Sequence, residues 1–174
     1  MVRPGIGQQL AGNPPFTAPA HRLNRVAARQ ALGLAEGDFV VCSFGMLGPT
    51  KLNHRLLAAW LATPMAKDKT CRLVFVGENH GGEYGASLLE AIHRSGCGER
   101  IKITGFAPAV QYRQYLAAAD VAVQLRALSR GETSAAVLDC MNYGLPAVVN
   151  AHGSLAELRR TVWSCCPMNL PTNN

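Results

Sequence analysis

Long hydrophobic runs are missing from this sequence of 174 residues. The longest strongly apolar stretches, Phe39–Phe44 and residues 145–149, fall well short of the ~20 residues that span a bilayer. The first twenty residues contain no apolar core of an export signal. We therefore expect no integral membrane segment and a cytoplasmic location.

Closely spaced metal ligands are also missing. The six cysteines form no C-x-x-C pair, and His21, His54, His80, His93 and His152 share no metal-binding spacing. Most of the cysteines stand far apart inside apolar segments, which favours buried free thiols over a disulfide framework. These absences predict a domain without a structural metal.

Aromatic residues make up only 6% of the chain, although its net charge is +6. A basic surface can attract nucleic acid, anionic lipid or a phosphorylated small molecule. The basic residues are scattered, and the densest group, Arg22, Arg25 and Arg29, has few aromatic neighbours on which bases could stack. We expect no nucleic-acid partner and interpret this group as a solvated helix face.

Hydrophobic residues, at 48%, are arranged in short apolar strands that alternate with helical patterns. Apolar strands joined in succession by helices predict an α/β, Rossmann-like parallel sheet with helices on both faces. Ligands bind at the carboxyl ends of such strands. The expected strands are 39–44, 72–76, 101–104, 121–125 and 147–150, and the expected helices are 52–61, 85–94, 109–118 and 133–143.

The segment SFGMLGPTK follows the first strand and ends at Lys51. Its glycines allow a close backbone approach, and a lysine at a helix start favours phosphate. The segment matches neither of the common glycine-rich phosphate motifs. A tight turn followed by a surface lysine remains the alternative.

The segment from Leu125 to Val149 contains more polar residues that could bind a ligand. Arg126 lies just after a strand, and Thr133 or Ser134 can begin a helix whose N–H groups and dipole could hold a diphosphate. Asp139, further along that helix, could accept hydrogen bonds from sugar hydroxyls. The alternative is that Glu132 and Ser134 only cap the helix and that Asp139 is solvated.

The stretches FVVCSFGMLGPTK, RLVFVGE, IKITGF, YLAAADVAVQLR and GETSAAVLDCMNYGLPAVVNAHGS resemble the carboxyl-terminal, donor-binding half of a GT-B glycosyltransferase of family 4. The resemblance runs from about Phe39 to Leu158. It implies that Gly45 and Lys51 belong to the loop that binds the donor diphosphate, although Met46 stands where a basic residue is usual. It also implies that Gly105 and Phe106 pack on the nucleotide base.

The family's two glutamates correspond here to Gly131 and Asp139, with Glu132 displaced by one position. By resemblance, Asp139 binds the ribose, and Glu132 faces the sugar if its loop shifts. We hypothesise that Arg126 replaces the charge missing at Met46. The donor-binding set is completed by Thr133, Ser134 and Ala135, and the residues expected to act in catalysis are Glu132, Lys51 and Arg126.

The resemblance implies transfer of a hexose such as mannose or rhamnose from a GDP-, UDP- or dTDP-sugar to a glycan acceptor, with retention and without an obligatory metal or other cofactor. It implies an amino-terminal acceptor domain that this sequence lacks, so the chain alone should be inactive. We expect residues 1–38 to be a linker and lead-in helix, 39–160 the donor-binding domain, and 161–174 an atypical tail, truncated or frame-shifted. The complete enzyme could also be peripheral at a membrane.

Two other functions stay open. One is a catalytically silent module that binds a nucleotide sugar or a partner protein. The other is a fragment of a GT-B nucleotide-sugar epimerase, which fits GETSAAVLD and AHGSLAEL less well.

Overall fold

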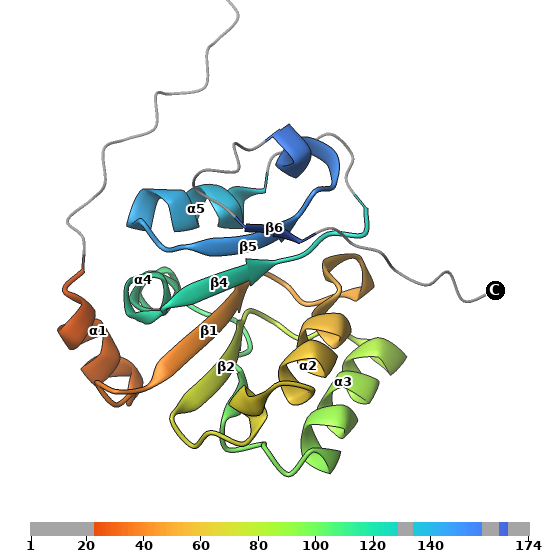
Figure 1. Cartoon of the computed structure of the whole chain (residues 1–174), viewed down its shortest axis with the longest axis horizontal. Coiled ribbons are helices and arrows are strands. Elements are labelled where there is room, and N and C mark those ends of the chain that lie inside the picture. The colour runs from red at the N-terminus through yellow and green to blue at the C-terminus, as the bar shows by residue number, and fades with distance from the viewer. Residues whose placement is uncertain (1–22, 129–133, 158–163, 167–174) are drawn as a thin grey trace, which may run out of the picture.

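A parallel sheet of six strands, in the order β3-β2-β1-β4-β5-β6, organises the chain (Figure 1). The structure is a computed structural model that describes residues 23–128, 134–157 and 164–166. The strands are β1 (Phe39–Phe44), β2 (Cys71–Val76), β3 (Ile101–Ile103), β4 (Val121–Gln124), β5 (Ala147–Asn150) and β6 (Ser164–Cys166).

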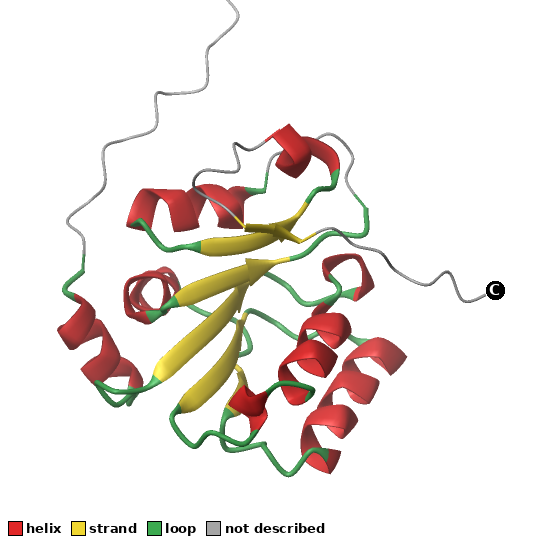
Figure 2. Cartoon of the chain, in the orientation of Figure 1, coloured by secondary structure: helices red, strands yellow, loops and turns green. Residues whose placement is uncertain are grey.

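Helices cover both faces of this sheet (Figure 2). On one side lie α2 and α3, and on the other lie α1, α4 and α5. The α-helices are α1 (Arg25–Leu32), α2 (Asn53–Leu61), α3 (Gly82–Arg94), α4 (Ala109–Ala118) and α5 (Ala135–Tyr143). Short 3-10 turns cover Pro49–Lys51, Pro64–Ala66 and Gly153–Glu157. The predicted α/β, Rossmann-like fold is therefore confirmed.

Strand β1 shows why its sequence is mostly apolar. Side chains alternate between the two faces of a strand. Val40 and Cys42 pack in the cluster under α4 and α5, whereas Val41 packs in the cluster under α2 and α3. All three are at most 4% exposed. A strand covered on both faces thus carries hydrophobic residues on both, and Ser43 is the one polar residue in β1.

Helix α1 corrects the interpretation of its arginines as a solvated face. Arg29 is only 4% exposed. It donates hydrogen bonds to the Ala118 carbonyl oxygen at 3.1 Å and to the Asp120 carboxylate at 2.8 Å. Arg25 also pairs with Asp120. The predicted helical spacing is correct, but it places Arg25 and Arg29 against the residues that precede β4 instead of facing water. Arg22 lies outside the described residues.

The cysteine prediction holds for the four cysteines whose state is described. Cys42, Cys71 and Cys140 are buried and Cys97 is half-buried, and all are free thiols. Within residues 23–128, 134–157 and 164–166, no group of three or more potential metal ligands comes together. In the same ranges, no helix is long and apolar enough to cross a membrane.

Candidate functional site

The loop after β1 makes a close backbone approach to the loop after β2. Gly45 adopts a φ of +97°, and its N–H donates to the Val76 carbonyl oxygen at 3.0 Å. A Cβ added at Gly77 would lie 2.3 Å from the Gly45 carbonyl oxygen. Both positions therefore require glycine, one for its positive φ and the other for space.

Lys51 reaches back over this loop. A Cβ at Gly45 would lie only 2.7 Å from Lys51 Nζ, so the ammonium group sits directly above the glycine. Burial, and then the positive charge of Arg126, lower the pKa of Lys51. The Ala127 N–H donates to the Thr50 carbonyl oxygen at 2.8 Å, which ties the loop after β4 to the turn that carries Lys51. Two cations thus lie close together at the carboxyl edge of the sheet.

Asn150, at the end of β5, fixes the backbone of Arg126. The Arg126 N–H donates to Asn150 Oδ1 at 2.7 Å, and Asn150 Nδ2 donates to the Arg126 carbonyl oxygen at 2.7 Å. Asn150 is 2% exposed. Sequence reasoning missed this residue, although its place at a strand end beside another strand end was the available signal.

The guanidinium group of Arg126 reaches the start of α5. It donates to the Ser134 hydroxyl oxygen at 3.2 Å. Ser134 occupies the N-cap position, but its side chain makes no capping hydrogen bond to the helix. The position of the N-cap is therefore as predicted, but the predicted capping hydrogen bond is absent. Arg126 lies beside the amino end of a nine-residue helix.

Asp139 is not simply solvated, because its Oδ2 accepts a hydrogen bond of 2.9 Å from the Tyr112 hydroxyl group. The Tyr112 ring packs edge-on against Phe44, the last residue of β1, with 5.3 Å between the ring centroids. Burial and the neighbouring Asp139 carboxylate raise the pKa of Tyr112. Asp139 therefore lies beside the strand end from which the Gly45 loop departs.

A third loop at the carboxyl edge of the sheet follows β3. Gly105 has a φ of +70°, and Thr104 Oγ1 accepts a hydrogen bond from the Gly77 N–H at 3.0 Å. Phe106 is 80% exposed, which is unusual for a large aromatic side chain. Its predicted contact with a nucleotide base stays a prediction.

Three positions complete the comparison with the sequence predictions. Met46 is 64% exposed beside the Gly45 loop. Glu132 and Thr133 lie outside the described residues, so the structure places neither of them. The described part of the site thus brings together Gly45, Lys51, Arg126 and Ser134, and places Asp139 at the neighbouring strand end.

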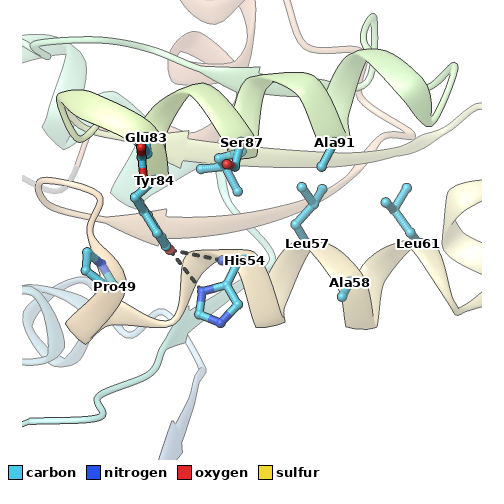
Figure 3. A pocket seen from close by; sticks show the side chains of 10 residues that line it. Pro49, His54, Leu57, Ala58, Leu61, Glu83, Tyr84, Ser87 and Ala91 are labelled. Atoms are coloured by element: carbon cyan, nitrogen blue, oxygen red, sulfur yellow. Dashed lines mark hydrogen bonds between the residues drawn. The ribbon is translucent and has the colours of Figure 1, made fainter.

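A separate groove of about 570 Å³ runs between α2 and α3 (Figure 3). At one end, the Tyr84 hydroxyl oxygen accepts a hydrogen bond from the His54 N–H at 3.2 Å and lies 3.1 Å from His54 Nδ1. Burial lowers the pKa of His54. The other lining residues are mostly apolar: Pro49, Leu57, Ala58, Leu61, Glu83, Ser87, Leu88 and Ala91.

A parallel α/β sheet with glycine loops and a pair of cations at its carboxyl edge defines the class of Rossmann-like α/β proteins, in which ligands bind at the carboxyl ends of the strands. The family is more specific than the class. Residues 24–160 match the family model of glycosyl transferases group 1, and the chain belongs to this family.

Solved structures with the same fold agree with this assignment. WaaG, a glycosyltransferase involved in lipopolysaccharide biosynthesis, is 19% identical with a TM-score of 0.65. Anabaena Alr3699/HepE in complex with UDP and glucose is 30% identical with a TM-score of 0.63. The chain is covered to 76% in both matches, but it spans only 34% and 35% of the two proteins.

A shorter structure matches over most of its own length. The C-terminal domain of a glycosyl transferase group 1 family protein (LpcC) from Francisella tularensis is 19% identical with a TM-score of 0.71. The match covers 86% of this chain and 76% of that domain. Comparison with the curated proteins finds no match.

Proposed function

We propose that this chain is the carboxyl-terminal, donor-binding domain of a retaining GT-B hexosyltransferase of family 4. One observation carries the proposal: Lys51 and Arg126 lie close together above a glycine loop, next to the amino end of α5. An anion bound beside them would interact favourably with both positive charges. A nucleoside diphosphate supplies an anion of suitable charge.

The same groups serve the chemistry of sugar transfer. When the bond between the sugar and the diphosphate breaks, negative charge accumulates on the departing diphosphate. Two fixed cations and the N–H groups of Ser134 and Ala135 stabilise that charge, a role that a metal ion fills in other enzymes. We therefore propose transfer without an obligatory metal, with Glu132 facing the sugar.

We assign the nucleotide to the neighbouring residues of the same edge. Asp139 would accept hydrogen bonds from the ribose, and Gly105 and Phe106 would pack on the base. The solved structures of Anabaena Alr3699/HepE contain UDP or UDP-glucose, which makes UDP the first nucleotide to test. We propose a nucleotide-linked hexose as donor, with GDP and dTDP as the alternatives to UDP, and a glycan as acceptor.

The acceptor site lies elsewhere in this proposal. The chain spans about a third of WaaG and of Alr3699/HepE, so the complete reaction would need an amino-terminal domain to bind the acceptor. We expect the chain alone to bind donor without transferring sugar. The complete enzyme would work in the cytoplasm, either free or at a membrane surface.

Calorimetric titration of the chain with UDP, GDP and dTDP tests the proposal. We expect binding of at least one of them, and a loss of about 10-fold or more in Arg126→Ala, because a hydrogen bond to a charged group is removed. Arg94→Ala, which removes an exposed cation on α3, is the matched control and should leave the affinity unchanged. If none of the three nucleotides binds, the proposal is wrong.

A double variant tests whether Arg126 replaces the charge missing at Met46. Met46 is 64% exposed, so Met46→Arg should fold normally. Adding Met46→Arg to Arg126→Ala should restore part of the lost affinity. No recovery would mean that the two positions do not serve the same diphosphate.

The exposed Met46 also favours a second candidate, a silent module that binds the nucleotide sugar without catalysis. Both candidates predict binding. They differ when the chain is joined or mixed with an acceptor domain: release of nucleoside diphosphate from the donor would support the transferase, and continued binding without release would support the silent module.

A further inference from the structure

We propose that Tyr112 is a positioning residue that makes the site selective for ribose over 2′-deoxyribose, by holding the Asp139 carboxylate in one orientation. This inference rests on the proposed function, because it assigns a role within the same nucleotide site. Tyr112 lies on α4, and neither its sequence position nor the family resemblance pointed to it.

Tyr112 is held in place from the sheet. Its ring contacts Phe44 edge-on, with an interplanar angle of 70°. Phe44 is 1% exposed and directly precedes Gly45. The phenol oxygen therefore has a fixed position relative to the glycine loop, because a ring packed against a buried strand end has little freedom to rotate.

That fixed phenol bonds one oxygen of Asp139. The Tyr112 O–H donates to Asp139 Oδ2 at 2.9 Å and, among the residues that the structure describes, no other side chain forms a hydrogen bond with this carboxylate. The raised pKa of Tyr112 keeps the phenol protonated, so it remains a donor. An ionised carboxylate has lone pairs on both oxygens, and Oδ1 keeps its full acceptor capacity for a ligand.

The ligand that matches this acceptor is a sugar hydroxyl group. Tyr112 supplies the first donor to the carboxylate, and a ribose hydroxyl would supply the second. Without Tyr112, the short Asp139 side chain could rotate among its rotamers, and ordering it would oppose binding. The contribution of Tyr112 should therefore appear only with a nucleotide that carries the hydroxyl.

The test compares UDP with 2′-deoxy-UDP, and GDP with 2′-deoxy-GDP, by calorimetric titration of the whole chain. We expect the wild-type chain to prefer the ribonucleotide by about 10-fold, the typical effect of one hydrogen bond to a charged group. Tyr112→Phe keeps the ring and removes only the hydroxyl. It should lower the affinity for the ribonucleotide, leave the affinity for the deoxynucleotide nearly unchanged, and reduce the ratio toward one.

Two further variants separate positioning from folding. Asp139→Asn retains the size of the side chain and should abolish the preference in the same way. Tyr115→Phe removes a hydroxyl from the fully buried tyrosine one turn further along α4 and should retain the preference. Melting temperatures of the variants should lie close to that of the wild type.

The outcomes distinguish this inference from the proposed function. An equal loss of affinity for ribo- and deoxynucleotides in Tyr112→Phe would give Tyr112 a structural role only and overturn the inference. So would an unchanged ratio in Asp139→Asn, or a wild-type chain that prefers the deoxynucleotide. In each of these cases the nucleotide still binds and the proposed function stands, whereas a chain that binds no nucleotide overturns both.

Discussion

The two ends of the parallel strands differ in how their arginine and lysine side chains are paired. At the amino ends, three arginines are matched by carboxylates: Arg25 and Arg29 with Asp120 before β4, and Arg72 with Asp38 before β1. At the carboxyl ends, Lys51 forms no ion pair with any described residue, and the positive charge of Arg126 contributes to its lowered pKa.

This difference separates folding from binding. Once a buried cation is paired with a carboxylate, removing one partner is costly, because it leaves the other charge buried without compensation. Lys51 is instead partly buried without an ion pair to a described residue, and under the proposed function a bound anion would supply its partner. The described ion pairs at the amino ends thus serve the fold, whereas we assign Lys51 to the ligand.

The largest effect is expected at the amino ends. Arg29→Met should lower the free energy of unfolding by about 3 kcal/mol, because it removes the partner of Asp120 and of the Ala118 carbonyl oxygen. Denaturant titration measures this. Arg25→Met is the control: Arg25 is 46% exposed, and its loss should cost about 1 kcal/mol or less. Similar losses in both variants would contradict the comparison.

The next effect is expected at the carboxyl ends. Lys51→Met should lower the affinity for the bound nucleotide by about 2 kcal/mol, roughly 30-fold, because a charged hydrogen-bond donor is lost. The free energy of unfolding of the empty chain should stay the same or rise, since the repulsion from Arg126 disappears. A clear loss of stability would show that Lys51 serves the fold instead.

A smaller effect is expected from pH. The pKa of Lys51 is lowered from 10.5 by burial and by Arg126. Between that lowered pKa and 10.5, the unfolded chain binds more protons than the folded one, so Lys51 makes stability rise with pH in this window. Nucleotide affinity should fall in the same window as the ammonium charge is lost. The difference between wild type and Lys51→Met isolates this contribution, and identical pH profiles would contradict it.

The smallest effect is expected from salt. Raising NaCl from about 0.05 M to about 0.5 M should weaken nucleotide binding several-fold, because the Debye length shortens and the attraction at the open carboxyl edge is screened. The contribution of buried Arg29 to stability should change little. Lys51→Met should show a weaker salt dependence of binding than the wild type, and an equal dependence would place the anion elsewhere.

The fold could be predicted because its signals are local. Strand β1 is apolar at every buried position except Ser43, and the end of α5 at Tyr143 is marked by Gly144, which adopts a positive φ. Strand β6 was not predicted, because its three residues form a strand only through their pairing with β5. The start of α3 at Gly82 was also missed, since Glu83 and Tyr84 in the preceding polar segment resemble a loop.

The site could be predicted only where a residue acts through its own chain neighbours. Lys51 follows its glycine loop closely in sequence, and its place beside Gly45 was predicted from that loop. Tyr112 meets Asp139 across 27 residues, and Asn150 meets Arg126 across 24. Contacts of this kind depend on strand order, which the sequence pattern does not contain. For the same reason the arginines of α1 were assigned to solvent, although Arg29 meets Asp120 across 91 residues.

The contact between Gly45 and Gly77 has a consequence for how such a domain can diversify. Where two loops meet main chain to main chain, with no room for even a methyl group at Gly77, the floor of the site has no side chain to exchange. Under the proposed function, new donor preferences would therefore come from exposed residues around it, such as Met46 and Phe106. The floor would stay the same for many sugars, while the rim changes one residue at a time.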